Sequence, residues 1–260
     1  MRAEDYIDKL ATEGRYHFTT AEAIEALGGS PASVRKQLRR LKQHRRLASP
    51  FRSFHITVPP EYRRLGCPPA EHFVDQLMEH LGEPYYVALL TAAERHGAAH
   101  QRPQAFQVMV RKSRPNIDCG GVRMTFTARA NLEQMPVTVS NTPRGYVRYS
   151  TPEITAFDLV GYPRKAAGMN NVATVLSELA EVLEQDKLVE AAELSPVGWS
   201  QRLGYLLEFL QQASLAEALK PYVEAHARSW APLRRAQNVA GAARNARWKL
   251  LINSDVEPDE

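Results

Sequence analysis

The sequence predicts an α+β protein with a short helix-rich N-terminal part and a larger part of mixed helices and strands. Two observations predict this division. Up to residue 58, three stretches with apolar residues at helical spacing precede a short alternating stretch. Beyond residue 65, alternating stretches typical of strands occur among long amphipathic stretches typical of helices. Because Pro59-Pro60 interrupts the pattern, we predict domains over residues 1–64 and 65–260.

Charge is distributed unevenly between the two parts. The chain has 260 residues and a formal net charge of +4, which is too small to indicate a nucleic-acid ligand by itself. Residues 1–64 hold 13 basic and 7 acidic side chains, whereas the other 196 residues hold 20 and 22. Residues 31–46 contain seven basic side chains and no acidic one. A second acid-free basic stretch, at 225–254, is either a solvated surface or an auxiliary patch that faces nucleic acid or a partner.

Three short helices are predicted in the first 43 residues. The first spans residues 3–14. Thr19 or Thr20 caps the second helix, which Gly28-Gly29 ends. Ser30-Pro31 starts the third, because serine caps helices well and proline suits the first helical position. Two helices that meet at a glycine-containing turn have the layout of a helix-turn-helix.

The third helix has two distinct faces. At about 100° per residue, Val34, Leu38 and Leu41 fall on one narrow apolar stripe, which we expect to dock on the rest of the domain. The opposite face carries small, basic and amide side chains: Ala32, Ser33, Lys36, Arg39, Arg40 and Gln43. A helix with such a face fits the DNA major groove. The alternative is that the basic face is only a solvated surface.

Candidate DNA-binding roles follow from position on the helix and from side-chain chemistry. The N-terminal turns of a recognition helix meet base edges. The candidates for base contacts are Ser33, Lys36, Gln37 and Arg40. Gln43 is a further DNA-binding candidate on the same face, and glutamine can pair with adenine. The candidates for phosphate contacts are Arg39, Lys42, Arg45 and Arg46.

A β-hairpin is predicted directly after the third helix. Leu47 begins one strand, and residues 54–58 alternate between apolar and polar side chains, as a half-buried strand does. Ser49 to Ser53 form the turn, which places Arg52 at its tip, where it can enter a minor groove or contact a phosphate. Three helices followed by such a hairpin make a winged helix-turn-helix. We therefore expect residues 1–64 to bind DNA.

The larger part is predicted to combine helices and strands. Helices are expected at residues 70–82, 85–99, 152–161, 170–190 and 200–227. Strands are expected at residues 104–111, 121–128, 137–140 and 146–149, with a last strand at 247–253 that returns to the sheet. Trp230 and Trp248 are expected to anchor the core, although tryptophan can also stack on bases.

Three segments resemble the AbiEi family of bacterial antitoxins and transcriptional regulators. They are YYVALLTAAERHGAAHQRPQAFQVMV at 85–110, STPEITAFDLV at 150–160 and RWKLLINSDVEPD at 247–259. The resemblance implies a protein encoded beside a nucleotidyltransferase-like toxin, which represses its own operon by binding inverted repeats in operator DNA. It also implies a C-terminal domain that opposes the toxin in a type IV system, without a stable complex being required. These motifs are core-like, so no antitoxin residue is carried over.

Motifs of common enzyme classes are missing from the sequence. No lysine follows an acidic residue by two positions, as a restriction-type nuclease core requires, and Walker A, GxGxxG, GxSxG and HExxH motifs are absent. Gly29-Ser30 lacks the paired acids that a nucleotidyltransferase needs, so we interpret it as a turn and a cap. We expect no catalysis and no cofactor. The alternatives are a nucleic-acid-processing enzyme with a winged-helix specificity domain and a ligand-sensing transcription factor.

Two weaker candidates for chemistry remain. His96 and His100 could hold a metal from one helix, but no third ligand is evident. Cys119 precedes Gly120-Gly121, where a nucleophile would lack a base. We expect surface histidines and a turn thiol, and no metal. Two cysteines, no long apolar run and a charged N-terminus predict a cytoplasmic protein without a membrane partner.

Overall fold

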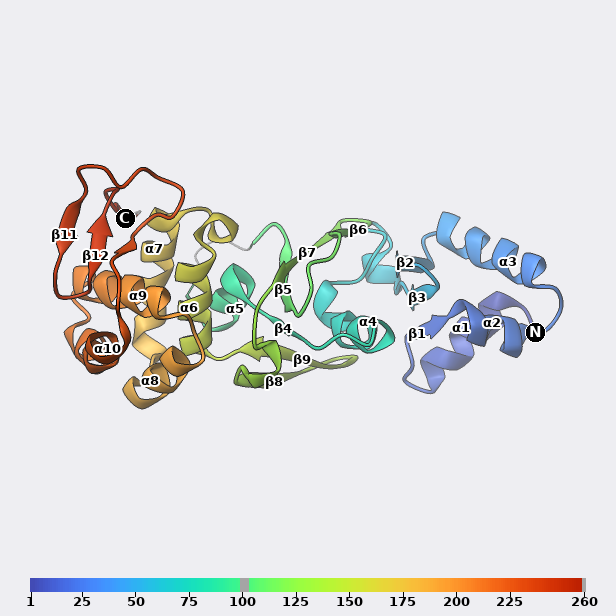
Figure 1. The fold of residues 1–260 in the computed structure, drawn as a ribbon. Helices are drawn as coiled ribbons and strands as arrows, with labels where there is room; N and C mark the ends of the chain where they lie inside the picture. The colour runs from blue at the N-terminus through green and yellow to red at the C-terminus, as the bar shows by residue number, and fades with distance from the viewer. Residues whose placement is uncertain (99–102, 259–260) are drawn as a thin grey trace. The chain divides into compact units, whose positions relative to one another are not determined.

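The computed structural model describes residues 1–98 and 103–258, and it has a mixed α+β fold as predicted (Figure 1). By its contacts the chain divides into two compact units. Unit 1 consists of Met1–Tyr86, Gln104–Leu132 and Val139–Arg148. Unit 2 consists of Val87–Pro103, Glu133–Thr138 and Tyr149–Glu260. This division follows contacts, whereas the division at residue 64 follows the sequence pattern and stays a prediction.

The N-terminal part of unit 1 contains three helices and a three-stranded sheet. Its elements are α1 (Ala3–Thr12), β1 (His17–Thr19), α2 (Thr20–Leu27), α3 (Pro31–Gln43), β2 (Leu47–Phe51) and β3 (Phe54–Thr57). The strands are antiparallel in the order β1-β3-β2, and β1 is absent from the sequence prediction. The hairpin turn is shorter than predicted, because β2 continues to Phe51 and leaves only Arg52 and Ser53 between the strands.

Side-chain caps fix where α2 and α3 begin. Thr19 and Glu22 form a capping box, in which Thr19 Oγ1 accepts from the Glu22 N–H at 3.2 Å and Glu22 Oε2 accepts from the Thr19 N–H at 2.6 Å. Ser30 Oγ accepts from the Ser33 N–H at 3.2 Å. Each such cap contributes about 1 kcal/mol. The predicted starts of both helices are therefore confirmed.

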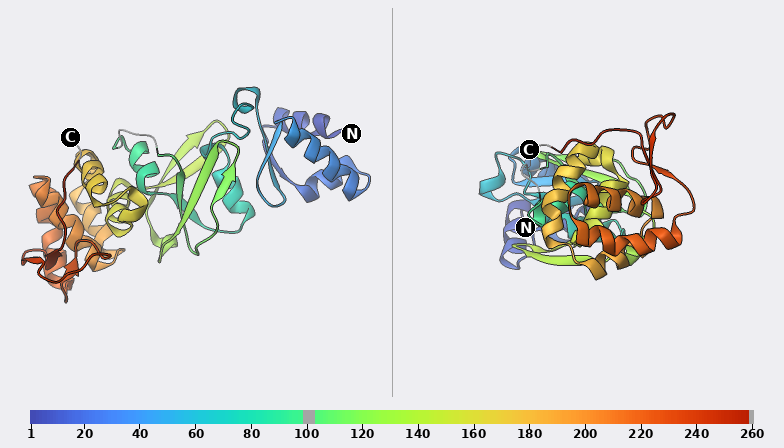
Figure 2. Two further views of the ribbon diagram at one scale, coloured as in Figure 1. Left: turned by 90° about the horizontal axis from the view of Figure 1, so that it is seen from above. Right: turned by 90° about the vertical axis from the view of Figure 1, so that its left-hand side faces the viewer.

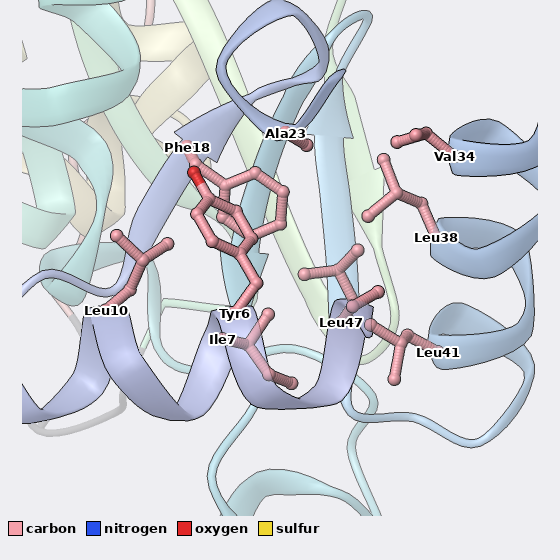
Figure 3. Packing of buried hydrophobic residues seen from close by; sticks show 10 residues of the cluster. Tyr6, Ile7, Leu10, Phe18, Ala23, Val34, Leu38, Leu41 and Leu47 are labelled. Atoms are coloured by element: carbon pink, nitrogen blue, oxygen red, sulfur yellow. The ribbon is translucent and has the colours of Figure 1, made fainter. Parts of the chain in front are cut away.

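The core of this part lies between α1, α3 and the sheet (Figure 3). Val34, Leu38 and Leu41 of α3 enter it from one side, and none of the three is more than 3% exposed. Tyr6 of α1 meets Phe18 of β1 edge to face, with 5.2 Å between the ring centroids. The predicted apolar stripe of the third helix is thus confirmed as its docking face.

The rest of the chain contributes further helices and strands to both units. The helices are α4 (Val74–His80), α5 (Leu89–Arg95), α6 (Pro152–Gly161), α7 (Met169–Leu179), α8 (Gln185–Glu193), α9 (Val197–Phe209) and α10 (Ala213–His226). Short 3-10 helices are η1 (Pro60–Tyr62), η2 (Ala70–His72), η3 (Leu132–Gln134), η4 (Pro163–Ala166) and η5 (Ala180–Val182). Within the described residues, every helix is too short or too polar to cross a bilayer.

The strands of this region form two sheets. They are β4 (Tyr85–Val87), β5 (Phe106–Val110), β6 (Ile117–Cys119), β7 (Val122–Ala128), β8 (Val137–Thr142), β9 (Gly145–Ser150), β10 (Ala231–Pro232), β11 (Ala243–Asn245) and β12 (Leu250–Ile252). The six-stranded sheet has the order β6-β7-β5-β4-β9-β8, with β5 parallel and β6 antiparallel to β7. The second sheet has the order β10-β12-β11.

Five predicted elements differ from the structure. The predicted helix over 70–82 is divided into η2 and α4 at Phe73. The predicted helix over 85–99 begins instead as strand β4, and its residue 99 lies outside the described part. The predicted helix over 170–190 is divided into α7 and α8 by η5. The predicted helix over 200–227 is divided into α9 and α10 at a turn where Gln211 has φ 62°. The predicted last strand, over 247–253, is β12, which pairs with β10 and β11 rather than returning to the larger sheet.

Helix α6 lies among the other helices of unit 2 (Figure 2), and its residues from Glu153 to Val160 are all buried. Thr151 caps it by accepting from the Ile154 N–H at 3.4 Å. The hydroxyl oxygens of Ser150 and Thr155 lie 2.7 Å apart, so the polar side chains at the helix start bond to each other. The segment STPEITAFDLV therefore encodes a capped, buried helix.

Trp248 connects the smaller sheet to α9. Its side chain is fully buried, and its Nε1 donates to Glu208 Oε2 at 2.5 Å. A Cβ added at Gly204 of α9 would lie 2.1 Å from the indole ring, so only glycine permits this approach. Trp230, in contrast, is 38% exposed and lies 5.5 Å from the Arg244 guanidinium. Core anchoring is thus confirmed for Trp248 and wrong for Trp230.

We expect Gly204→Ala to lower the free energy of unfolding by about 1–3 kcal/mol, because the added methyl group displaces the Trp248 ring. Urea unfolding followed by tryptophan fluorescence measures this change. The control is Gly198→Ala in the same helix, whose added Cβ would meet Ala231 at an ordinary 3.7 Å. An equal loss of stability in both variants would contradict the packing role of Gly204.

Candidate nucleic-acid interface

The candidate interface is built on α3, whose rotation about its own axis is set by the buried stripe described above. Gly28 and Gly29 have φ of 69° and 81°, and this left-handed backbone makes the sharp turn between α2 and α3. The outward side of α3 carries exposed residues that the sequence assigned to DNA binding: Ser33, Lys36, Arg39, Arg40, Lys42 and Gln43. We call this set the α3 basic face. In residues 1–98 and 103–258, no acidic side chain forms an ion pair with any of its four cations.

Three other residues that the sequence assigned to DNA binding are bonded within the protein. Gln37 is half-buried, and its Oε1 accepts from the Ala3 N–H at 3.1 Å. Arg45 Nη1 donates to the Arg64 carbonyl oxygen at 3.0 Å. A DNA contact by either side chain requires that its present bond be given up or shared.

Arg46 is neutralised by the first helix. Its guanidinium pairs with Asp8 at 3.3 Å and with Glu4 at 3.5 Å, and both acids belong to α1. The structure therefore separates Arg46 from the cations of the α3 basic face, although all of them belong to one basic run in the sequence.

The hairpin places Arg52 at its exposed tip, as the sequence predicted. Two contacts hold this hairpin to the start of α2. The Ser53 carbonyl oxygen accepts from the Thr20 N–H at 3.0 Å. His55 of β3 bridges Thr20 Oγ1 at 2.9 Å and Ser49 Oγ at 2.7 Å. These bonds fix the hairpin relative to the start of α2.

His55 is buried, so the regular alternation expected for its strand is wrong at this position. The sequence pattern treats histidine as a polar outward residue, whereas here both ring nitrogens have hydroxyl partners. Burial, followed by the nearby charge of Lys42, lowers the pKa of His55 to about 4. The ring therefore stays neutral at physiological pH.

A groove of about 490 Å³ in unit 1 extends the cationic surface beyond α3. Lys42, Arg52 and Arg114 line it. Asp118 also lines it, but this carboxylate accepts from Arg123 Nε at 2.8 Å and its charge is compensated. The groove thus presents three cations between the hairpin and the loop that precedes β6.

Arg114 was missed by the sequence reasoning because it lies far from α3 along the chain. Its guanidinium lies 5.8 Å from the centre of the Phe51 ring and 5.5 Å from that of Phe126. The available signal was the short basic run at residues 111–114, between two predicted strands. Only the fold shows that this run lies beside the hairpin.

The other candidates for chemistry have structural partners. His96 is half-buried rather than a surface residue, its Nε2 lies 2.8 Å from the Ser150 carbonyl oxygen, and burial lowers its pKa. His100 lies outside the described residues. Cys119 is not a simple turn thiol, because it is buried and its hydrogen bond to Cys67, together with burial, raises the pKa of Cys67. The described residues contain no group of three or more side chains suited to a metal ion.

The lowered pKa of His55 gives a testable pH dependence. Below about pH 6.5 the His55 ring is protonated in the unfolded chain, whereas in the folded chain it stays neutral down to about pH 4. As the pH is lowered through this window, the free energy of unfolding therefore decreases by about 1.4 kcal/mol per pH unit. We expect wild type to lose about 2 kcal/mol more stability than His55→Gln between about pH 7 and about pH 5. Urea unfolding followed by circular dichroism measures both. Equal pH dependence in the two proteins would contradict the buried neutral ring.

Comparison with known proteins finds a described family for the middle part of the chain. Residues 86–209 match the family model of the AbiEi antitoxin C-terminal domain. No match is found among curated proteins. The fold is similar to that of the RV2827C protein from Mycobacterium tuberculosis, known from a crystal structure, with a TM-score of 0.67 and 15% identity over 96% of this chain and 90% of that chain. The predicted resemblance to the AbiEi antitoxins is therefore confirmed over residues 86–209.

Proposed function

We propose that residues 1–64 form a winged helix-turn-helix that binds operator DNA, with α3 in the major groove. The α3 basic face carries this proposal, because one side of the helix is docked and the other presents exposed cations without acidic partners in the described part of the chain. The glycine turn between α2 and α3 and the two-residue hairpin after α3 support it.

The structure also supports a division of roles among the basic residues. We assign base contacts to Ser33, Lys36, Arg40 and Gln43, and phosphate contacts to Arg39 and Lys42. Arg52 is proposed to reach the minor groove or a phosphate, with Arg114 extending the same surface. Gln37, Arg45 and Arg46 are given the role of holding α3 in place, because each is already bonded to another part of unit 1.

We propose that the AbiEi domain opposes a nucleotidyltransferase-like toxin encoded beside this chain, in a type IV system. AbiEi antitoxins pair with a toxin in toxin–antitoxin systems, and the match over residues 86–209 is the support for this role. The DNA-binding part then represses the shared operon at inverted repeats, where two copies of the reader occupy two half-sites. Neither role requires this chain to catalyse a reaction.

We expect Lys36→Ala with Arg40→Ala to abolish specific binding to the chain's own promoter. Each base contact contributes about 1–3 kcal/mol, so affinity should fall at least about 30-fold. Both side chains are exposed, so the fold should be retained. A gel-shift titration of promoter DNA against unrelated DNA of the same length measures the loss.

The matched control is Arg63→Ala with Arg64→Ala, which removes the same charge from exposed positions of unit 1 outside α3. The bond from Arg45 goes to backbone carbonyl oxygens there and survives the substitution. The recognition-helix assignment would be contradicted if the α3 variant kept its specific affinity for the promoter, or if the control variant lost as much of that affinity.

Co-expression with the neighbouring toxin-like gene tests the antitoxin role separately. We expect the full chain, produced from an unrelated promoter, to restore growth that an empty vector does not restore. The Lys36→Ala/Arg40→Ala variant should restore growth equally, because the AbiEi domain begins at residue 86, well beyond α3. Growth arrest that persists with the wild-type chain would overturn the antitoxin role even if DNA binding stands.

A further inference from the structure

Unit 2 contains a pocket that neither proposed role uses. It has a volume of about 580 Å³ and lies between the turn after α6, the start of α7 and the segment that follows β10. Pockets of about 300–1,000 Å³ are typical of small-molecule sites. Val160, Met169 and Leu233 contribute apolar walls. All of its lining residues belong to unit 2, so the site is complete within one unit.

The polar part of this pocket is strongly cationic. Five basic side chains line it: Arg164, Lys165, Arg202, Arg234 and Arg235. No acidic residue is among the described residues that line it. Arg164 and Arg235 are exposed, and neither forms an ion pair within residues 1–98 and 103–258. Like charges this close repel one another, so the arrangement favours an anion between them.

Arg202 of α9 is the most deeply placed of these cations. It is only 2% exposed, and its Nε donates to the Pro232 carbonyl oxygen at 2.9 Å. Burial, followed by the charge of Arg235, lowers the pKa of Arg202 to about 10. In the described part of the chain no carboxylate pairs with it. A buried cation without a counter-charge is costly, and a bound anion would offset that cost.

Arg234 and the first turn of α7 add hydrogen-bond donors to the same place. Arg234 Nη2 donates to Asn170 Oδ1 at 2.8 Å, while its Nε is buried and has no partner among the described residues. Gly168 precedes α7 with φ 101° and has no side chain to cap the helix. Gly168 and Met169 both line the pocket, so the uncapped N–H groups of α7 lie at its wall, and helix N-termini favour anions.

We propose that this pocket binds a phosphate-bearing small molecule. Its phosphate groups would be held by Arg164, Arg202 and Arg235, with the rest of the ligand against the apolar walls. A single carboxylate would leave most of the five cations unpaired, whereas one or two phosphate groups match them, and arginine binds phosphate through paired N–H donors. A DNA duplex fits less well, because Arg202 lies too deep for a backbone phosphate to reach.

Isothermal titration calorimetry of the full chain tests the proposal with inorganic pyrophosphate, adenosine monophosphate and adenosine. We expect pyrophosphate and adenosine monophosphate to bind with dissociation constants below about 1 mM, and adenosine to show no binding in that range. Arg164→Ala with Arg235→Ala should weaken binding at least about tenfold, and these exposed positions leave the fold intact. Arg228→Ala is the control, since it removes an exposed cation from the same basic stretch outside the pocket and should leave affinity unchanged.

Three results would overturn the proposal. The first is that neither phosphate-bearing probe binds the wild-type chain. The second is that Arg228→Ala weakens binding as much as the double variant does, since the attraction would then be a general effect of the basic stretch. The third is that a short DNA duplex displaces adenosine monophosphate, and that binding of this duplex is weakened by Arg164→Ala with Arg235→Ala as much as binding of adenosine monophosphate is. The pocket surface would then bind nucleic acid. All the variants used here leave α3 unchanged, so the operator gel shift stands or fails independently.

Discussion

The burial of Val34, Leu38 and Leu41 fixes the rotation of α3, and what the N-terminal part presents to a ligand depends on that rotation. Burying each of these side chains contributes about 1.5–3 kcal/mol. A rotation of one residue in one direction would put Arg35, Arg39 and Lys42 into the core in their place. Rotation in the other direction would bury Ser33, Gln37 and Arg40. Both alternatives bury unpaired polar or charged groups, so the outward position of the cations is a consequence of the core.

The same part of the chain shows why a basic run does not by itself define a binding surface. Arg40 and Arg46 are six positions apart in one acid-free run, yet their surroundings differ. Arg46 lies over α1, where Glu4 and Asp8 neutralise it, whereas Arg40 is exposed on the far side of α3. Charge that is compensated within the fold stabilises the packing of helices, and only the uncompensated remainder is available to a phosphate backbone. Tertiary structure, rather than composition, decides between these roles.

Local rules predicted the helical N-terminal part well, because caps and stripes are encoded within a few residues. Thr19, Glu22 and Ser30 cap where the sequence predicts, and the stripe of α3 docks as expected. The secondary structure of the larger part was harder to predict for a physical reason. Strand β4 is three residues long and buried on both sides, so its pattern does not differ from that of a buried helix. The turn between α9 and α10 contains no glycine or proline, and a non-glycine residue, Gln211, takes the positive φ there. Arg114 and Arg202 escaped prediction because only folding brings them to other cations.

In the larger part, too, the net charge of the sequence does not show where the fold gathers cations. Residues 65–260 hold two more acidic than basic side chains, which suggests no anionic ligand. The fold nevertheless gathers five cations from η4, α9 and the segment after β10 around one cavity, with Arg202 buried among them. Such clustering lowers the stability of the unliganded protein, because each charge raises the cost of holding the others nearby. By linkage, an anion that binds only the folded state restores that stability. The repulsion that destabilises the unliganded cluster and the attraction that binds an anion therefore have the same electrostatic origin. The net charge of residues 65–260 indicates neither of them.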